Sequence, residues 1–287
     1  MTEALTTTNE HGVDPSDGTR DEWDDIAGGY DAYVTPTHMW LADEGLRRAG
    51  LRSGMAFLDV AAGSGALSIP AARLGANVLS TDMSPVMLKK LEARAGKEGL
   101  DLETRVMDGH ALELEDNTFD ISGSQFGVML FPDMPRGISE LARVTKPGGQ
   151  VLMTVYGAPQ KIEFFGFFVH AIQAAVPDFT GPPTDPPPLP FQLQDPEKLR
   201  QELGNSGLKN ISVETITEKL EFQSGQGLWE WLTNSNPIVG MLLAELSLTN
   251  EQIATVRQAL DGMIRKRSGG SGPAVLTNPI NIGIGTK

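Results

Sequence analysis

Two segments of this chain end an apolar stretch in a carboxylate next to small residues, a pattern that suits a nucleotide-like ligand. Asp59 is followed within six residues by Gly63 and Gly65, and a helix is predicted over 67–74. Glycine lets a backbone loop approach a ligand closely, and the helix N-terminus presents free N–H groups to it. A second apolar strand ends at Asp82, whose carboxylate can accept hydrogen bonds from both hydroxyls of a ribose. Together the two segments indicate a nucleoside pocket.

The number of glycines indicates which nucleoside is bound. A dinucleotide site uses G-x-G-x-x-G, whereas here Gly63 and Gly65 are followed by Ser68 and preceded by Ala61. The usual cradle for a pyrophosphate is therefore incomplete. A nicotinamide-dependent oxidoreductase remains an alternative, but the chain also lacks a Tyr-x-x-x-Lys-like pair.

The run 59–65 resembles motif I of class I methyltransferases that use S-adenosyl-L-methionine (SAM), commonly D-V-G-C-G-T-G. Three further segments match the family in the same order. Residues 82–88 resemble its D-x-S-P-x-M-L, 107–111 resemble its adenine segment, and 146–149 resemble the K-P-G-G turn before its fifth strand. Four ordered matches indicate a SAM-dependent enzyme.

The resemblance is closest to the ubiquinone/menaquinone-biosynthesis branch (methyltransferase type 11), through residues 124–133 and the helix predicted at 138–144. It covers residues 20 to 156 well, so it implies a cofactor site more firmly than an acceptor. Ala61 departs from the family's glycine. We expect Ala61 to keep a negative φ and to alter only the turn geometry.

The resemblance implies a set of cofactor-binding residues, namely Tyr30, Asp59, Ala61, Gly63, Gly65, Asp82, Met83, Asp108, Gly109 and Gln125. In the family pattern, Asp59 holds the loop or, through a water molecule, the amino group of SAM, and Asp82 takes the ribose hydroxyls. Met83 packs on the adenine, while Asp108 and the backbone of Gly109 meet its N6 and N1.

The methionine end of SAM is expected between two of these residues: Gln125 offers its carbonyl to the ammonium group, and Tyr30 lies nearby on an N-terminal lid helix. Structural alternatives stay open for three residues. Asp82 can serve as a strand-end carboxylate that caps the next helix, Asp108 can have a structural role, and Tyr30 can belong to a helix that only covers the core.

Methyl transfer needs a nucleophile placed in line and a base only for acceptors that keep their proton. Candidate bases are His38, His110, His170 and Tyr156. His110 falls in the adenine segment, and His170 lies among phenylalanines, where a buried structural histidine is expected. His38 is therefore the preferred catalytic residue. Asp133 is expected to be the N-cap of the next helix.

Composition narrows the partners. The formal net charge is -14 and the pI about 4.7, which opposes binding to nucleic-acid phosphates. The chain has no cysteine, which excludes disulfides, a thiolate nucleophile and zinc–thiolate sites, and we expect no metal. The apolar run near 164–176 is too short to span a bilayer, and no signal peptide is visible. We expect a cytoplasmic protein with a small-molecule acceptor.

The alternation of strands and helices predicts an α/β fold with parallel βαβ units. The resemblance to class I methyltransferases implies a Rossmann-like seven-stranded sheet, six strands parallel and one antiparallel, with helices on both faces and helical substrate-lid insertions. Pro70 conflicts with a helix over 64–74 unless the helix begins late. The expected organisation is a disordered tail (1–20), N-terminal lid helices (21–50), a SAM-binding core (51–156), an aromatic and proline-rich insertion (157–194), a core helix with strand six (195–222), a helical insertion (223–272) and a final antiparallel strand (273–287). Within the helical insertion, a pair of helices is expected over 224–267.

Aromatic residues gather in the two insertions, and Phe168 and Trp231 represent them. One interpretation is ordinary core packing. The other is a hydrophobic acceptor pocket under a lid, because both insertions follow strands whose ends border ligand sites in such sheets. The predicted function is methyl transfer to a small apolar or aromatic acceptor at O, N or C, and the alternative is a catalytically silent SAM-binding protein. The acceptor and the oligomeric state are not indicated.

Overall fold

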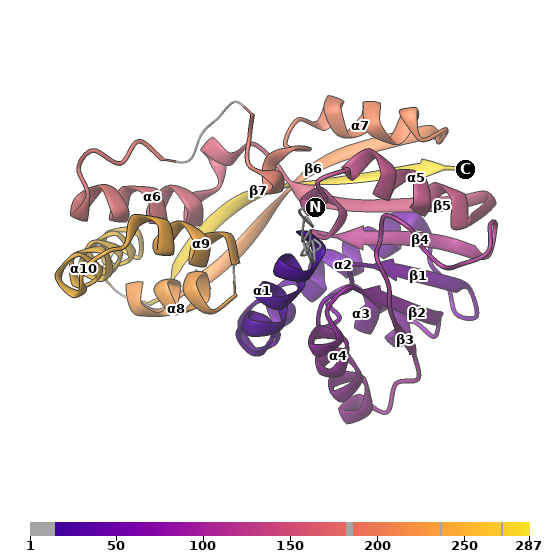
Figure 1. The fold of residues 1–287 in the computed structure, drawn as a ribbon, viewed down its shortest axis with the longest axis horizontal. Helices are drawn as coiled ribbons and strands as arrows, with labels where there is room; N and C mark the ends of the chain where they lie inside the picture. Colours follow the sequence, from indigo (N-terminus) through magenta and orange to yellow (C-terminus); the bar gives the residue numbers. More distant parts are fainter. Residues whose placement is uncertain (1–14, 182–185, 236, 271) are drawn as a thin grey trace, which may run out of the picture.

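The strands of the cofactor-binding segment join two strands from the C-terminal third in one seven-stranded sheet, of order β3-β2-β1-β4-β5-β7-β6 (Figure 1). The structure is a computed structural model that describes residues 15–181, 186–235, 237–270 and 272–287. The strands are β1 (Ala56–Val60), β2 (Asn77–Asp82), β3 (Glu103–Val106), β4 (Phe119–Gln125), β5 (Thr145–Tyr156), β6 (Lys209–Phe222) and β7 (Ala274–Thr286).

The first five strands are parallel, and β1 lies between β2 and β4. Phe57, Leu58 and Val60 are all buried, as expected for a strand covered on both faces. The sheet is mixed because β7 makes two antiparallel pairings, one with β5 and one with β6. The single antiparallel strand expected from the sequence therefore has antiparallel neighbours on both sides.

Helices cover both faces of the sheet. On one face, α2 (Thr35–Ala49) and α3 (Ser68–Arg73) pack with Phe57 and Leu152. On the other, α5 (Met134–Val144) and α7 (Pro196–Asn205) pack with Leu58 and Met153. The helix α4 (Pro85–Glu98) follows β2 and contacts β2 and β3.

The first helix after the glycine loop, α3, begins at Ser68, next to the start of the predicted segment 67–74 and later than the wider range 64–74. This start places Pro70 in the first turn, where its missing N–H has no intrahelical partner to lose. Pro70 is therefore compatible with α3, because the helix begins late, as the sequence analysis required.

The outer halves of β6 and β7 leave the sheet as a two-stranded ribbon, because β7 pairs with β6 from Ala274 but with β5 only from Ile280. Figure 1 shows this ribbon running into a second lobe on the left. The helices of that lobe, here called the helical lobe, are α6 (Glu163–Ala175), α8 (Gly225–Ser235), α9 (Pro237–Leu246) and α10 (Asn250–Arg267).

The helical pair predicted at 224–267 is wrong: three helices occupy this segment. Pro237 starts α9, and Thr249 forms a capping box at the start of α10. The last strand is also longer than the alternating run 280–285 suggested, because β7 begins at Ala274.

The N-terminal segment is one helical run in three parts: α1 (Pro15–Gly29), a π-helical turn η1 (Tyr30–Val34) and α2. Residues 15–20, predicted as part of the tail, belong to α1, and 1–14 lie outside the described residues. The prolines at 182 and 183 also lie outside them. Gly29 is required by packing, because a Cβ there would stand 1.7 Å from the backbone O of Asn234 in α8.

Candidate functional site

Asp59 is buried at the end of β1 with half of its carboxylate unpartnered. Its Oδ2 accepts a hydrogen bond from Ser68 Oγ at 2.5 Å, and its Oδ1 has no hydrogen-bond partner among the described residues. Burial raises the pKa of Asp59 to about 7, against the hydrogen bond from Ser68, and the nearby Asp82 adds to the rise. A buried acceptor atom without a donor is costly unless a ligand supplies one.

Asp82 ties the glycine loop to the start of α4. Its Oδ2 accepts from the N–H of Gly63 and its Oδ1 from the N–H of Ser84, both at 2.8 Å. Burial raises the pKa of Asp82 to about 6, against these backbone hydrogen bonds. Asp82 therefore does have the structural role that the sequence left open, as a strand-end carboxylate at the start of the next helix. It does not use every lone pair, since each carboxylate oxygen has two.

Ala61 has a φ of 56°, in the left-handed region that glycine prefers. The expectation of a negative φ is wrong, because the chain keeps the glycine-type turn and forces alanine into it, at a cost of roughly 1–2 kcal/mol. Gly127 makes this possible: a Cβ on Gly127 would lie 2.5 Å from the Cβ of Ala61.

Tyr30 lies over the glycine loop, as the lid interpretation expects. Its Cε1 is 3.4 Å from the position that a Cβ of Gly63 would take, and Trp23 packs edge-on against its ring at 5.8 Å. Burial raises the pKa of Tyr30 above its ordinary value, and Asp82 and Asp59 add to the rise. The loop is also held by a hydrogen bond of 2.5 Å between the hydroxyls of Thr35 and Ser64.

In the adenine segment, Asp108 and His110 bind each other. The carboxylate of Asp108 accepts from the N–H of His110 and lies 2.7 Å from its Nδ1. Partial burial acts to raise the pKa of Asp108, but the hydrogen bonds from His110 outweigh it and hold the pKa below its ordinary value. The His110 ring packs on Phe131 at 4.4 Å, and Phe131 also occupies the space that a Cβ of Gly109 would need. Met83 is half-buried beside Asp82.

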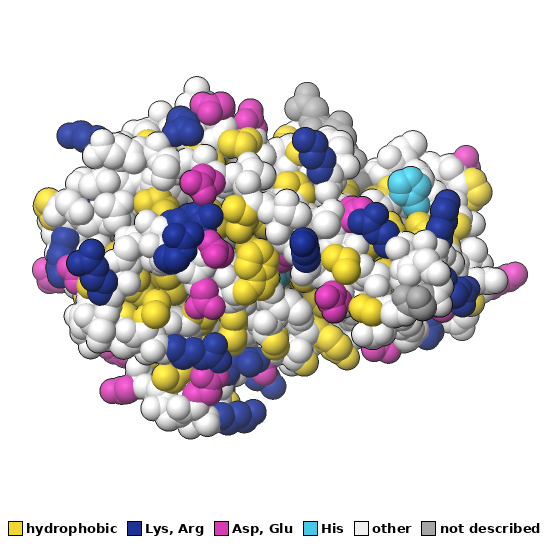
Figure 2. Space-filling model, turned by 180° about the vertical axis from the view of Figure 1, so that it is seen from behind, with side chains coloured by type: hydrophobic (Ala, Val, Ile, Leu, Met, Phe, Trp, Pro, Cys, Tyr) yellow, Lys and Arg dark blue, Asp and Glu magenta, His cyan; other side chains and the backbone are white. Residues whose placement is uncertain are grey.

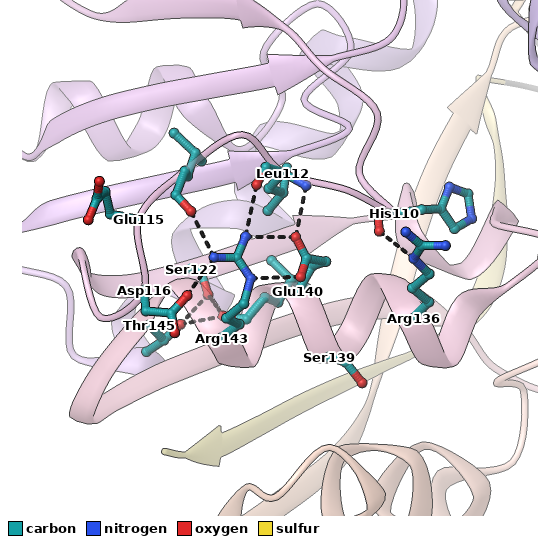
Figure 3. Close-up of polar contacts among 12 residues, drawn as sticks. His110, Leu112, Glu115, Asp116, Ser122, Arg136, Ser139, Glu140, Arg143 and Thr145 are labelled. Atoms are coloured by element: carbon teal, nitrogen blue, oxygen red, sulfur yellow. Dashed lines mark hydrogen bonds and ion pairs between the residues drawn. The ribbon is translucent and has the colours of Figure 1, made fainter.

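Two arginines of α5 hold this loop, and sequence reasoning missed both. Figure 3 shows Arg143 donating to the carbonyls of the 112–114 segment and to carboxylates on either side, and Arg136 donating to the carbonyl of His110 at 2.7 Å. Hydrogen bonds with Glu140 and Asp116 raise the pKa of Arg143 above its ordinary value. An arginine three residues after a glutamate is a common surface pattern, so the sequence carries no specific signal for this role.

Gln125 and His38 lie together where β4 ends. The Gln125 amide donates to the backbone O of His38 at 3.1 Å, and its Oε1 has no hydrogen-bond partner in the described part of the chain. His38 is only 2% exposed, with its Nε2 3.1 Å from Oε1 of Glu218, which is fully buried. Sequence reasoning missed Glu218, because β6 alternates charged and apolar residues as a half-exposed strand does.

The other candidate bases are placed differently. His170 is exposed on α6, with its Nδ1 2.6 Å from the carbonyl of Gly166, so the expectation of a buried histidine is wrong. The phenylalanines of that helix face inward and leave His170 on the outer side. Tyr156 stacks on Phe126 at 4.6 Å, and burial, with Glu218 and Tyr30, raises its pKa well above the ordinary value. Asp133 caps α5, as predicted.

Phe168 and Trp231 are both buried in the core of the helical lobe, around Phe164. The rings of Phe164 and Trp231 meet edge-on at 5.0 Å. A separate groove of about 560 Å³ lies where α1 and η1 meet α8, and neither Phe168 nor Trp231 lines it. Aromatic packing is therefore established at these two positions, and a pocket there remains a proposal.

The residues present fit SAM. The amino group of its methionine part needs buried acceptors, and two unpartnered ones, Asp59 Oδ1 and Gln125 Oε1, end neighbouring strands of the sheet. The loop between them has Gly63 and Gly65 at φ values of 54° and 99°, which leaves backbone open to a ligand. Fold and site together define the class of Rossmann-like nucleoside-binding proteins with a ligand at the carboxyl edge of the strands.

Comparison with known proteins narrows this class. Residues 58–153 match the type 11 family model described as a methyltransferase domain. The chain is 30% identical over 178 residues to the demethylmenaquinone methyltransferase of Corynebacterium urealyticum, which covers 60% of this chain and 75% of that protein. This chain therefore belongs to the type 11 methyltransferase domain family.

Two further similarities differ in reach. An uncharacterised protein of Mycobacterium bovis is 46% identical over 103 residues, but this match spans 36% of this chain and only 38% of that relative. The phosphoethanolamine N-methyltransferase 2 of Haemonchus contortus, solved with SAM, has a TM-score of 0.57 at 21% identity and covers 96% of this chain and 60% of that one. The second similarity supports the fold alone.

Proposed function

We propose that this protein transfers a methyl group from SAM to a small-molecule acceptor. The observation that carries the proposal is the pair of unpartnered buried acceptor atoms, Asp59 Oδ1 and Gln125 Oε1, at the ends of β1 and β4. An ammonium group between them would satisfy both atoms and would offset the burial of the Asp59 carboxylate.

The remaining contacts follow the motif order. Asp82 takes the ribose hydroxyls with the lone pairs that the backbone leaves free, and Gly63 and Gly65 let the cofactor approach the loop. Asp108, Met83 and Gly109 surround the adenine. When bound, SAM supplies a methyl group on a positively charged sulfur, so the protein has to bind, orient and desolvate the acceptor.

The acceptor enters between the cofactor edge and the helical lobe and is largely apolar or aromatic. Support comes from the aromatic contacts that continue from Phe126 through Tyr156 and Phe164 to Trp231. His38, packed on Phe126 at 5.0 Å, acts as the base for an acceptor that must lose a proton. Tyr156 stays protonated because its pKa is raised, which leaves it a hydrogen-bond donor.

A small molecule suits the surface better than a nucleic acid. The net charge is -14, and Figure 2 shows acidic and basic side chains interspersed on the face it displays, with no single basic patch. None of the described helices is both long and apolar enough to cross a bilayer.

Calorimetry with SAM, S-adenosylhomocysteine and NAD tests the proposal. We expect both SAM and S-adenosylhomocysteine to bind and NAD not to, and Asp59→Asn to weaken SAM without unfolding the protein. Binding of NAD in place of SAM would contradict the proposal. A turnover assay that follows S-adenosylhomocysteine release with a panel of phenols and amines separates an enzyme from a catalytically silent SAM-binding protein.

A further inference from the structure

Buried polar side chains form a row across one face of the sheet. Gln125 pairs with Thr154, and Glu218 pairs with Asn278, so each pair shares a face. Thr154 lies opposite Ile282, which is on the same side of β7 as Asn278 because side chains alternate along a strand. All four residues carry a side-chain oxygen without a hydrogen-bond partner among the described residues. The row leads from the methionine end of the cofactor site to the ribbon.

At the ribbon end of the row, His38 and Glu218 form a buried ion-pair contact of 3.1 Å, with 2% and 0% of the side chains exposed. Asn278 donates to the other carboxylate oxygen of Glu218 at 2.9 Å. Neither His38 ring nitrogen has a well-aligned hydrogen bond within the described residues. A buried carboxylate and imidazole with unused hydrogen-bonding capacity cost stability, so this arrangement needs a functional reason.

The His38–Glu218 pair is next to the proposed reaction centre. The backbone O of His38 is bound by Gln125, and the His38 ring lies on Phe126, which in turn stacks on Tyr156. The titratable groups near His38 are Glu218 from β6, Tyr156 from β5 and, beyond Tyr156, Tyr30 from η1. No lysine or arginine belongs to the contacts described for this group.

We propose that Glu218 is a positioning residue for His38, and that His38, Glu218 and Asn278 form the polar end of the acceptor pocket. This proposal rests on the proposed function. The carboxylate holds the Nε2 side of the imidazole, which leaves the Nδ1 lone pair free to take a proton.

The acceptor suited to this end carries a proton and no negative charge, because a buried carboxylate without a neighbouring cation repels an anion. In the reaction the acceptor atom forms a bond to the methyl carbon while the carbon–sulfur bond breaks. The electron pair of the broken carbon–sulfur bond stays on sulfur. The acceptor's proton passes to His38 Nδ1, and Glu218 stabilises the imidazolium that results.

The proposal assigns a site role to the ribbon, which lies outside the residues matched by the family model. The methyl donor would then be held by β1, β2 and β4, and the proton acceptor would be oriented by β6 and β7. Variation in the ribbon would change the acceptor without changing the cofactor.

The first test uses wild-type protein saturated with S-adenosylhomocysteine. It is titrated with p-cresol and p-toluate, which share a ring and differ in the charge of the polar group. We expect p-cresol to bind at least about tenfold more tightly than p-toluate and to shift the ¹⁵N imidazole signals of His38, an effect of roughly the size of one charge-assisted hydrogen bond.

Tighter binding of p-toluate, or no binding of p-cresol to protein that binds S-adenosylhomocysteine, overturns the assignment and leaves the proposed function standing. Failure to bind SAM and S-adenosylhomocysteine at all would instead refute the proposed function. The two failures are thus distinguishable.

The second test compares Glu218→Gln with Glu214→Gln in the absence of ligands. Glu214 is on the same strand but is exposed and paired with Arg48, so it is a matched control. Removing the carboxylate at 218 should change the ¹⁵N imidazole signals of His38, because the group that holds its Nε2 side is lost and the ring can take the other tautomer.

The control should leave the ¹⁵N imidazole signals of His38 in place, and Glu218→Asp should restore them in part. Unchanged ¹⁵N signals of His38 in folded Glu218→Gln overturn the positioning role. Where Glu218→Gln does not fold, the wild-type binding series decides.

Discussion

The two ends of the proposed site are held together in different ways. At the cofactor end, Asp82 binds the N–H of Gly63, 19 residues earlier in the chain, and the N–H of its near neighbour Ser84. At the acceptor end, Glu218 is bound by Asn278, 60 residues away, and contacts His38 on α2. A cofactor loop made from local contacts is fixed by a short motif, whereas an acceptor end made from distant segments can diverge separately.

Replacing His38 should separate the two ends most clearly. We expect His38→Gln to lower turnover by roughly 10²–10⁴-fold, because proton removal is lost, while SAM affinity is unchanged. Steady-state kinetics with any accepted phenol, together with SAM calorimetry, measures both quantities. A loss below threefold would favour catalysis by proximity alone.

Truncating the aromatic residues of the helical lobe should cost stability first. Phe168 and Trp231 are 1% and 5% exposed, so Phe168→Ala and Trp231→Ala should each lower the free energy of unfolding by about 3–5 kcal/mol. Chemical denaturation measures this loss, and SAM calorimetry in the folded variants should show little change. If acceptor Michaelis constants also stay unchanged, these two positions do not line the pocket.

The cofactor end is tested by Asp82→Ala. The loss of hydrogen bonds to a charged acceptor should weaken SAM binding by roughly 1–3 kcal/mol. Because Asp82 also binds Gly63 and Ser84, the melting temperature must be measured alongside the affinity. Unchanged SAM affinity in a folded variant would remove Asp82 from the ribose.

The joint between α1 and the helical lobe offers a matched pair of glycines. Gly29→Ala should destabilise the protein by about 1–3 kcal/mol, because the new methyl group would meet the backbone of Asn234. Gly28→Ala meets nothing within 4 Å and should stabilise α1 by roughly 0.5–1 kcal/mol. Thermal denaturation compares the two, and equal effects would show that this contact does not matter.

A pH dependence is also expected at the cofactor end. Burial raises the pKa of Asp59 from 3.8 to about 7 and that of Asp82 from 3.8 to about 6. Between pH 4 and 7 the folded, ligand-free protein therefore binds more protons than the unfolded chain. The free energy of unfolding that these two carboxyl groups contribute falls as the pH rises through this range.

A bound ammonium group favours the charged carboxylate, so SAM affinity should rise severalfold as pH increases through the same range. Calorimetry at pH 5.5 and 8 checks this, and Asp59→Asn should flatten the dependence. Tighter SAM binding at the lower pH would contradict the assigned role of Asp59.

The same contrast explains how far sequence reasoning reached. Residues 56–60 and 119–125 were predicted as strands and are β1 and β4. β1 is an apolar run interrupted only by Asp59 and followed by a turn of small residues, so this strand is encoded locally. Glu218 could not be found in this way. Its burial depends on pairing with Asn278 and on the position of α2, and neither leaves a trace in the neighbouring residues.

Ala61 shows a different limit. Its side chain gave no reason to expect a positive φ, and the turn is possible only because Gly127, far away in sequence, leaves space for its methyl group. His170 was misplaced for a similar reason: its aromatic neighbours in sequence face the core of the helical lobe while the histidine faces outward. Residue type indicates what is buried nearby, and only the packing indicates which side of a helix is buried.

The π-helical turn η1 sets the angle at which side chains before and after it point from the N-terminal helical run. Tyr30 begins this turn and lies on the cofactor loop, and His38 follows in α2 and contacts the ribbon. An α-helix advances about 100° per residue, so the wider turn changes the angle between these two side chains relative to an uninterrupted α-helix. One continuous helical segment therefore carries a side chain to the glycine loop and another to the ribbon. The angle between Tyr30 and His38 depends on the number of residues in the turn.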